Sequence, residues 1–265
     1  MPVSKKRKKA KGKKPQSSRG GGPPGYQPGM IDDDFDLTHA LLSTMPVEAL
    51  PTLGMATWHL ASTPNRMANQ CLPACATLML AIRSLGIEAN MIGLMLDIPW
   101  GRGGQGVRYG NEHPHMEGDL LVGHVGLIAG TRFLDPTASQ FPEIRNNGGF
   151  RPISANLGAR TAQVLADGTQ AGIGLEGGKM VIYHLLPLGS ADEVAMHLME
   201  RERDKVVANV QNLQVLFGAA LAGLGETRVQ EILAGPHPGL AALVARSVNK
   251  TVTMGDDGLA VLVDQ

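Results

Sequence analysis

Residues 69–87 read NQCLPACATLMLAIRSLGI, and this stretch predicts the best-defined helix of the chain. Its apolar residues recur at helical spacing and form one stripe: Cys75, Leu78, Met79, Ile82 and Leu85. Pro73 fits the first turn of a helix, where its missing N–H does no harm, and Gly86 suits the helix end. We therefore expect a helix that opens at Cys71, followed by a buried strand over residues 87–98.

A cysteine at the start of a helix suggests nucleophilic chemistry. The thiolate is the reactive form, and the positive end of the helix dipole with its free N–H groups would lie beside the Cys71 sulfur. The same N–H groups would receive a developing oxyanion, with Gln70 as an extra donor and Leu72 as a substrate contact. Cys75 lies one turn further along the apolar stripe, so we expect it in the core.

A histidine and an aspartate further along the chain supply the other parts of such a catalyst. His124 lies in a strand-like run over residues 120–129, and Asp135 follows a second run over 131–134, with a turn at Gly130. Neighbouring antiparallel strands would let the Asp135 carboxylate reach one imidazole nitrogen while the other serves as a general base. Further candidates for the cleft or for substrate contact are the following four: Thr137, Gln140, His113 and His115.

Taken together, these motifs resemble the transglutaminase-like superfamily of papain-like cysteine enzymes over roughly residues 65–140. In that family a cysteine opens a helix that ends in Leu-Gly-Ile, which residues 85–87 match, and an aspartate stands in Asp-Pro-Thr, which residues 135–137 match. The resemblance implies an α+β fold with a papain-like core, in which a helix packs on an antiparallel sheet. It also implies that Cys71 is the nucleophile, His124 the base and Asp135 the orienting acid.

The family carries out acyl transfer through an acyl-cysteine. The resemblance thus implies amide hydrolysis, deamidation or transamidation of a peptide or protein through acyl-Cys71, with no cofactor. The chain departs from the family pattern in two places: Val125-Gly126 replaces the usual aromatic residue beside the histidine, and Asn69-Gln70 precedes the cysteine. Two alternatives therefore stay open: an inactive papain-like binding module, and a small-molecule N-acyltransferase similar to arylamine N-acetyltransferases.

A zinc site is another use of the same residue types. Cys71, Cys75, His113, His115 and His124 together contain enough ligands for one ion. Two cysteines on one helix with histidines in a distant Gly/Pro-rich loop do not match the spacing of a compact zinc finger. We therefore expect no metal site.

The charges of the chain are segregated, although the formal net charge is zero. Residues 1–30 contain nine Lys or Arg and no acidic residue, so the other 235 residues carry 15 basic and 24 acidic side chains. This composition predicts a disordered basic tail. Two interpretations of the tail stay open: binding of nucleic acid or another polyanion without sequence specificity, and a solvated segment that only aids solubility. In the inactive-module alternative, this tail would tether the module to the polyanion.

The remaining pattern predicts three regions: a tail over residues 1–36, a cysteine-enzyme domain over 37–188 and a helical C-terminal extension over 189–265. Within the domain we expect a long loop over 99–118 and strands over 161–165 and 180–186. Helices are expected over 191–218, 226–233 and 239–248. The charge run at 200–205 is typical of a solvated helix face.

Neither a membrane span nor a disulfide framework is expected. No apolar run approaches the roughly 20 residues of a membrane helix, and no signal-peptide pattern follows the basic start. Two cysteines four residues apart do not form a framework of disulfides. We expect a cytoplasmic protein, in which a free thiolate survives.

Overall fold

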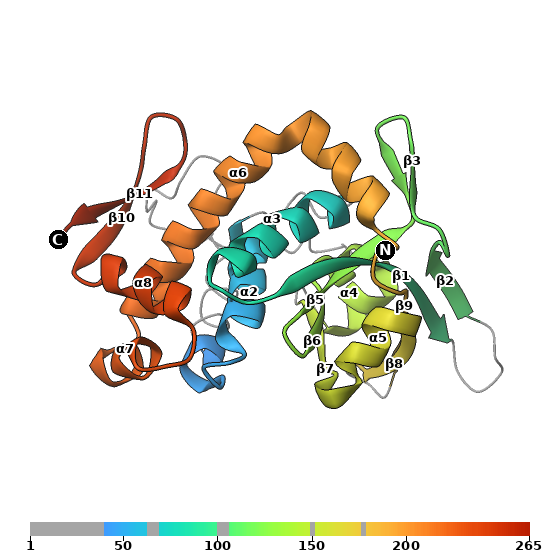
Figure 1. Cartoon of the computed structure of the whole chain (residues 1–265), viewed down its shortest axis with the longest axis horizontal. Helices are drawn as coiled ribbons and strands as arrows, with labels where there is room; N and C mark the ends of the chain where they lie inside the picture. The colour runs from blue at the N-terminus through green and yellow to red at the C-terminus, as the bar shows by residue number, and fades with distance from the viewer. Residues whose placement is uncertain (1–39, 63–68, 100–105, 149–151, 176–178) are drawn as a thin grey trace, which may run out of the picture.

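The computed structural model describes residues 40–62, 69–99, 106–148, 152–175 and 179–265. The predicted basic tail therefore lies outside the described residues, and the described chain begins with a short helical segment over 40–44. The described chain is an α+β fold built on an antiparallel sheet with helices packed around it (Figure 1).

The main sheet has seven strands in the order β7-β6-β5-β1-β9-β8, with β2 also paired to β1. Every pairing in it is antiparallel. Its strands are β1 (Ala89–Pro99), β2 (Gly106–Gly110), β5 (His124–Ala129), β6 (Arg132–Asp135), β7 (Ile153–Asn156), β8 (Thr169–Gly174) and β9 (Met180–Leu185). Two separate hairpins complete the strands: β3 (His115–Glu117) with β4 (Leu120–Val122), and β10 (Lys250–Met254) with β11 (Ala260–Asp264).

The helices named in Figure 1 and the short helical turns fall into three groups along the described chain. The first group contains α2 (Met55–Ser62) and α3 (Cys71–Ser84), preceded by the π-helical turn η1 (Leu50–Gly54). Shorter helices follow β6 and β7: η3 (Ala138–Gln140), α4 (Pro142–Gly148), η4 (Gly158–Arg160) and α5 (Thr161–Asp167). The C-terminal helices are α6 (Asp192–Ala222), α7 (Glu226–Leu233) and α8 (Pro238–Ser247).

The sheet separates two hydrophobic clusters. Along β5, Val125 and Leu127 contribute to the cluster that contains α3, whereas Ile128 contributes to the cluster on the other face. This division follows from the alternation of side chains along a strand. On β6, Phe133 belongs to the second cluster. The same alternation places His124 and Asp135 on the face of Ile128 and Phe133, so the register brings the histidine and the aspartate to one side.

The C-terminal helices share the first cluster with α3. Phe217 of α6, Leu240 of α8 and Leu78 of α3 are fully buried members of one contiguous set. A kink divides α6, because Glu202 has non-helical backbone angles (φ −126°, ψ 21°). Figure 1 shows the helix bending so that its two halves descend on opposite sides of α3. The boundary at residue 188/189 stays a prediction, and the residues after it pack into the same core.

Several expected elements are present and some differ. The helix from Cys71, the strand after it, the hairpin that turns at Gly130 and the three C-terminal helices are confirmed. The expected strand over 161–165 is wrong, because α5 occupies that segment. The segment 99–118, expected to be a loop, contains β2 and the start of the β3–β4 hairpin. The sequence of this segment is rich in Gly and His, so its short strands could not be recognised from an apolar pattern.

No helix among the described residues is long and apolar enough to cross a membrane.

The packing of α6 on α8 gives a first prediction. A Cβ at Gly218 would lie 2.5 Å from Ser247 Oγ and 3.0 Å from Leu243 Cγ, both in α8. We expect Gly218→Ala to lower the free energy of unfolding by about 1–3 kcal/mol, as overpacking of a core does. Gly223→Ala is the control, because its Cβ would meet nothing closer than 3.5 Å. Equal urea-unfolding midpoints for both variants would contradict tight docking of the C-terminal helices.

Candidate active site

The N-terminus of α3 carries Cys71 as its first residue, with Gln70 as the cap. Pro73 has no N–H, and the N–H of Ala74 donates to the Gln70 carbonyl at 2.9 Å. The N–H groups of Cys71 and Leu72 are therefore the ones that the helix itself leaves without an acceptor. Asn69, just before the cap, has a left-handed backbone (φ 61°), a conformation that asparagine tolerates better than most residues.

His124 and Asp135 form a buried pair. Nε2 of His124 lies 2.8 Å from Oδ2 of Asp135, and the two residues are 1% and 0% exposed. Taking two charges out of water costs several kcal/mol per ion unless other hydrogen bonds satisfy them. The stability of this buried pair therefore depends on the other hydrogen bonds that the Asp135 carboxylate accepts.

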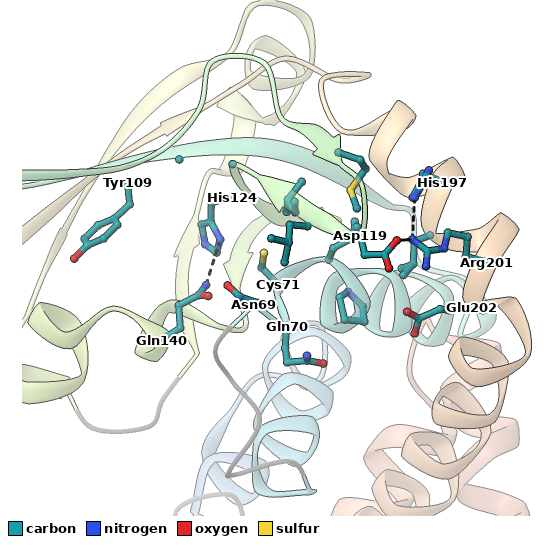
Figure 2. Close-up of a pocket in the computed structure, with 18 of the residues that line it drawn as sticks. Asn69, Gln70, Cys71, Tyr109, Asp119, His124, Gln140, His197, Arg201 and Glu202 are labelled. Carbon is teal, nitrogen blue, oxygen red and sulfur yellow. Dashed lines mark hydrogen bonds and ion pairs between the residues drawn. The ribbon is translucent and has the colours of Figure 1, made fainter.

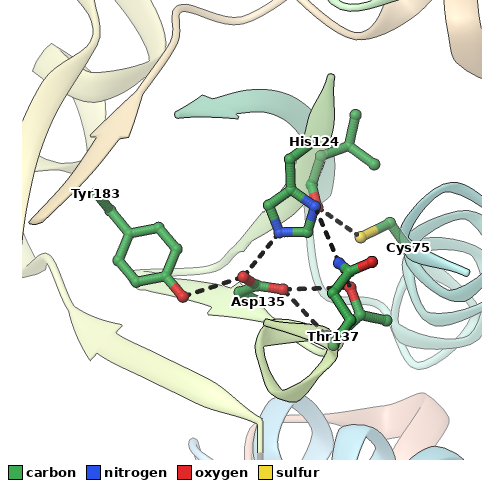
Figure 3. Close-up of polar contacts among 7 residues, drawn as sticks. Cys75, His124, Asp135, Thr137 and Tyr183 are labelled. Carbon is green, nitrogen blue, oxygen red and sulfur yellow. Dashed lines mark hydrogen bonds and ion pairs between the residues drawn. The ribbon is translucent and has the colours of Figure 1, made fainter. Parts of the chain in front are cut away.

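Four donors surround the Asp135 carboxylate. Besides His124, the hydroxyl of Tyr183 donates to Oδ2 at 3.0 Å, and both the backbone N–H and the hydroxyl of Thr137 approach Oδ1, at 3.0 and 3.4 Å (Figure 3). Each hydrogen bond to a charged group contributes about 1.5–3 kcal/mol, so together they offset the cost of burial. These contacts fix the direction of the carboxylate.

The other ring nitrogen of His124, Nδ1, faces the cysteine. Burial alone would lower the pKa of His124, but the Asp135 carboxylate and a hydrogen bond with Cys71 raise it to about 10. Figure 2 shows the Cys71 sulfur directed toward the His124 ring from the start of α3. The amide of Gln140 lies 3.4 Å from Nδ1 and 3.2 Å from the Thr137 hydroxyl. The three residues expected to form a triad are therefore brought together.

An aromatic residue does lie beside the histidine, although it comes from elsewhere in the chain. Phe141, just after η3, packs edge-to-face on His124 with ring centroids 5.1 Å apart. Tyr109 of β2 also packs against Phe141, with ring centroids 4.3 Å apart, and its hydroxyl donates to Glu143 at 2.9 Å. Phe141 thus makes the aromatic contact with His124 that the next residues in the sequence, Val125 and Gly126, do not make.

Cys75 is a core residue, in agreement with its position on the apolar stripe. It is fully buried and donates to the backbone carbonyl of Val125 at 3.5 Å. Burial, and after it the charges of Cys71 and Asp135, raise the pKa of the Cys75 thiol well above its usual value. This thiol therefore stays protonated and does not compete with Cys71.

A pocket of about 380 Å³ opens at Cys71 and His124. Gln70, Leu72 and Gln140 line it, as predicted. The other side of the pocket comes from the β3–β4 hairpin and the first half of α6, which contribute these residues: Met116, Asp119, Leu120, Leu121, His197, Leu198, Arg201, Glu202 and Lys205. The charge run at 200–205 is mostly exposed, as expected of a solvated helix face, and Arg201, Glu202 and Lys205 of this run also line the pocket.

Other predicted residues lie elsewhere. Thr137 is buried behind His124 and does not line the pocket. His113 is exposed, and His115 of β3 has its ring beside the His113 carbonyl (2.9 Å) and Glu117 (3.6 Å). Neither histidine is among the residues lining the pocket, so their role as substrate contacts stays a prediction. Figure 2 shows the Gln70 amide turned away from the Cys71 sulfur.

Within the described part of the chain, no three His, Cys, Asp or Glu side chains are grouped so as to hold a metal ion.

Sequence reasoning missed Tyr183, Phe141, Asn69 and the α6 residues of the pocket. Tyr183 comes from β9, which pairs with β1 and lies 48 residues after Asp135 in the chain. No spacing rule connects positions so far apart. The i, i+4, i+8 spacing of His197, Arg201 and Lys205 was a usable signal, because it places three basic residues on one helix face.

Two histidines whose pKa values are shifted in opposite directions give the next prediction. His124 has a carboxylate partner and a pKa of about 10, whereas loss of water around His59 on α2 lowers its pKa to about 4. In NMR spectra of ring-labelled protein at neutral pH, we expect His124 as an imidazolium and His59 as a neutral ring. The Asp135→Asn variant should lower the pKa of His124. A neutral His124 ring at pH 7 in the unmodified protein would contradict the assignment.

Comparison of the chain with protein-family models, with curated proteins and with solved structures returned no match.

Proposed function

We propose that this protein is a cysteine-dependent acyl-transfer enzyme of the transglutaminase-like, papain-like kind, acting through an acyl-Cys71 intermediate. The arrangement that supports this proposal is a cysteine at the start of a helix, a histidine at the start of β5 and an aspartate at the end of β6. Chemistry on an amide or thioester carbonyl is what such a set of groups performs.

The observation that carries the proposal is the orientation of His124. Its Nε2 is fixed by Asp135, which leaves Nδ1 for the Cys71 sulfur. A protonated ring beside the sulfur stabilises the thiolate by charge, and the N-terminus of α3 adds to this. A merely structural histidine needs no cysteine at its second nitrogen.

The steps follow from this geometry. The Cys71 thiolate attacks the carbonyl carbon, and the N–H groups of Cys71 and Leu72 receive the oxyanion. The proton on Nδ1 of His124 passes to the leaving amine or thiol as the bond to the carbonyl carbon breaks. Water or an amine then attacks acyl-Cys71 while His124 takes its proton, and the thiolate is released.

This proposal predicts acylation at one cysteine. With p-nitrophenyl acetate, we expect a burst of p-nitrophenolate and an acetyl group on Cys71 in mass spectra. Cys71→Ser should abolish the burst, and His124→Asn should slow it about a hundredfold, the typical value of a general base.

Cys75→Ala is the matched control, because it removes a thiol of the same helix that the pocket does not contain. It should retain the burst. Absence of acetyl-Cys71 in the folded, unmodified protein would favour the alternative of an inactive binding module.

Tyr183 gives a separate prediction for the support of the carboxylate. Tyr183→Phe removes the hydroxyl that donates to Asp135 and keeps the ring, which packs on Phe133 at a centroid distance of 4.9 Å. We expect the acylation burst to slow about tenfold, the worth of one hydrogen bond to a charged group. The NMR signals of the His124 ring should shift as well. An unchanged burst and unchanged ring signals would show that Tyr183 only fills space.

A further inference from the structure

The guanidinium of Arg201 lies at the α6 end of the pocket, where the side chain is exposed. Its Nη1 forms an ion pair with Asp119, which lies between the two strands of the β3–β4 hairpin. The same Nη1 lies 3.4 Å from Nε2 of His197, one helical turn earlier. Figure 2 shows Arg201 held by these two residues, with Cys71 and His124 at the other end of the pocket.

The rest of this guanidinium is available. Nε and Nη2 of Arg201 form no hydrogen bond with any described residue. These two N–H groups point to one side of the planar group, and this pair binds a carboxylate through two parallel hydrogen bonds. Arg201 is thus a pocket-lining residue whose Nη1 is engaged and whose second edge is occupied by no described residue.

The backbone of α6 brings Arg201 to this position. The non-helical angles of Glu202 bend the helix directly after Arg201. Because of this bend, the half of α6 before it turns toward the β3–β4 hairpin (Figure 1). A straight continuation of the half that packs on α3 would carry residues 192–201 in another direction.

The charges around Arg201 partly cancel one another, which limits how strongly this part of the pocket selects a ligand by its charge. Lys205 adds a positive charge one turn after Arg201, but Asp119 and Glu202 offset these charges through exposed ion pairs. Exposed pairs contribute little and exchange partners easily. Selection in this part of the pocket rests on the planar geometry of the guanidinium more than on net charge.

We propose that Arg201 binds a carboxylate of the substrate while Cys71 attacks the carbonyl at the other end of the pocket. This inference rests on the proposed acyl-transfer function and names the substrate class: acyl compounds that bear a carboxylate. The carboxylate belongs either to a chain terminus or to an Asp or Glu side chain, and both present the same planar pair of oxygens.

The test uses alkylating probes, because alkylation of Cys71 requires no turnover. The Cys71 sulfur forms a bond to the probe carbon as iodide leaves. N-iodoacetyl-glycine, N-iodoacetyl-β-alanine and N-iodoacetyl-4-aminobutyrate carry a terminal carboxylate at increasing distance. N-iodoacetyl derivatives of aspartic and glutamic α-amides carry a side-chain carboxylate. Each acid is compared with its neutral amide, and the modified cysteine is identified by mass spectrometry.

We expect at least one acid probe to alkylate Cys71 about tenfold faster than its amide at low ionic strength, with the ratio falling in salt. Arg201→Gln should remove this preference, and Arg201→Lys should weaken it because the planar pair of donors is lost. Arg203→Gln is the matched control: it removes the same charge two residues away, at an exposed position that does not line the pocket. It should retain the preference.

The possible outcomes separate the two proposals. If iodoacetamide alkylates Cys71 no faster than a free peptide thiol, the proposed function fails. If Cys71 reacts fast and His124→Asn slows it, but no acid probe outpaces its amide, only the carboxylate site is overturned. A preference that persists in Arg201→Gln also overturns it. A preference for terminal or for side-chain acids identifies the source of the carboxylate.

Discussion

The buried pair of His124 and Asp135 is the interaction on which the candidate site depends. Two ionisable groups with almost no exposure are stable only because donors from three elements converge on the carboxylate. Those donors require β5, β6, the turn after β6 and β9 to keep one register. The sheet therefore fixes the direction of Nδ1, which leaves this nitrogen on the side of Cys71.

The helix that carries Cys71 is positioned by the rest of the core. Its apolar stripe packs against β5 on one side and against α6 on the other, in one cluster that also includes α8. The kink of α6 then brings the charged residues of its first half back to the pocket. The C-terminal residues thus contribute to stability through one half of α6 and to the pocket wall through the other.

Local patterns predicted much of this architecture. The apolar spacing after Cys71 gave α3, and the position of Pro73 and the stripe separated Cys71 from Cys75. Gly130 predicted the hairpin that brings the strands of His124 and Asp135 together. The segment 161–165 was misassigned to a strand, because a short apolar run suits a strand and a helix equally well and tertiary packing decides between them.

The sequence by itself determined the order of the three candidate residues, their placement on a helix start and two strands, and the core role of Cys75. Periodicity and turn residues act over a few positions, and these features are local. Only the tertiary structure decided the partners that come from distant segments: Tyr183 at Asp135, Phe141 at His124 and Arg201 in the pocket. Their contacts arise from strand register and from a helix kink, which no spacing in the sequence encodes.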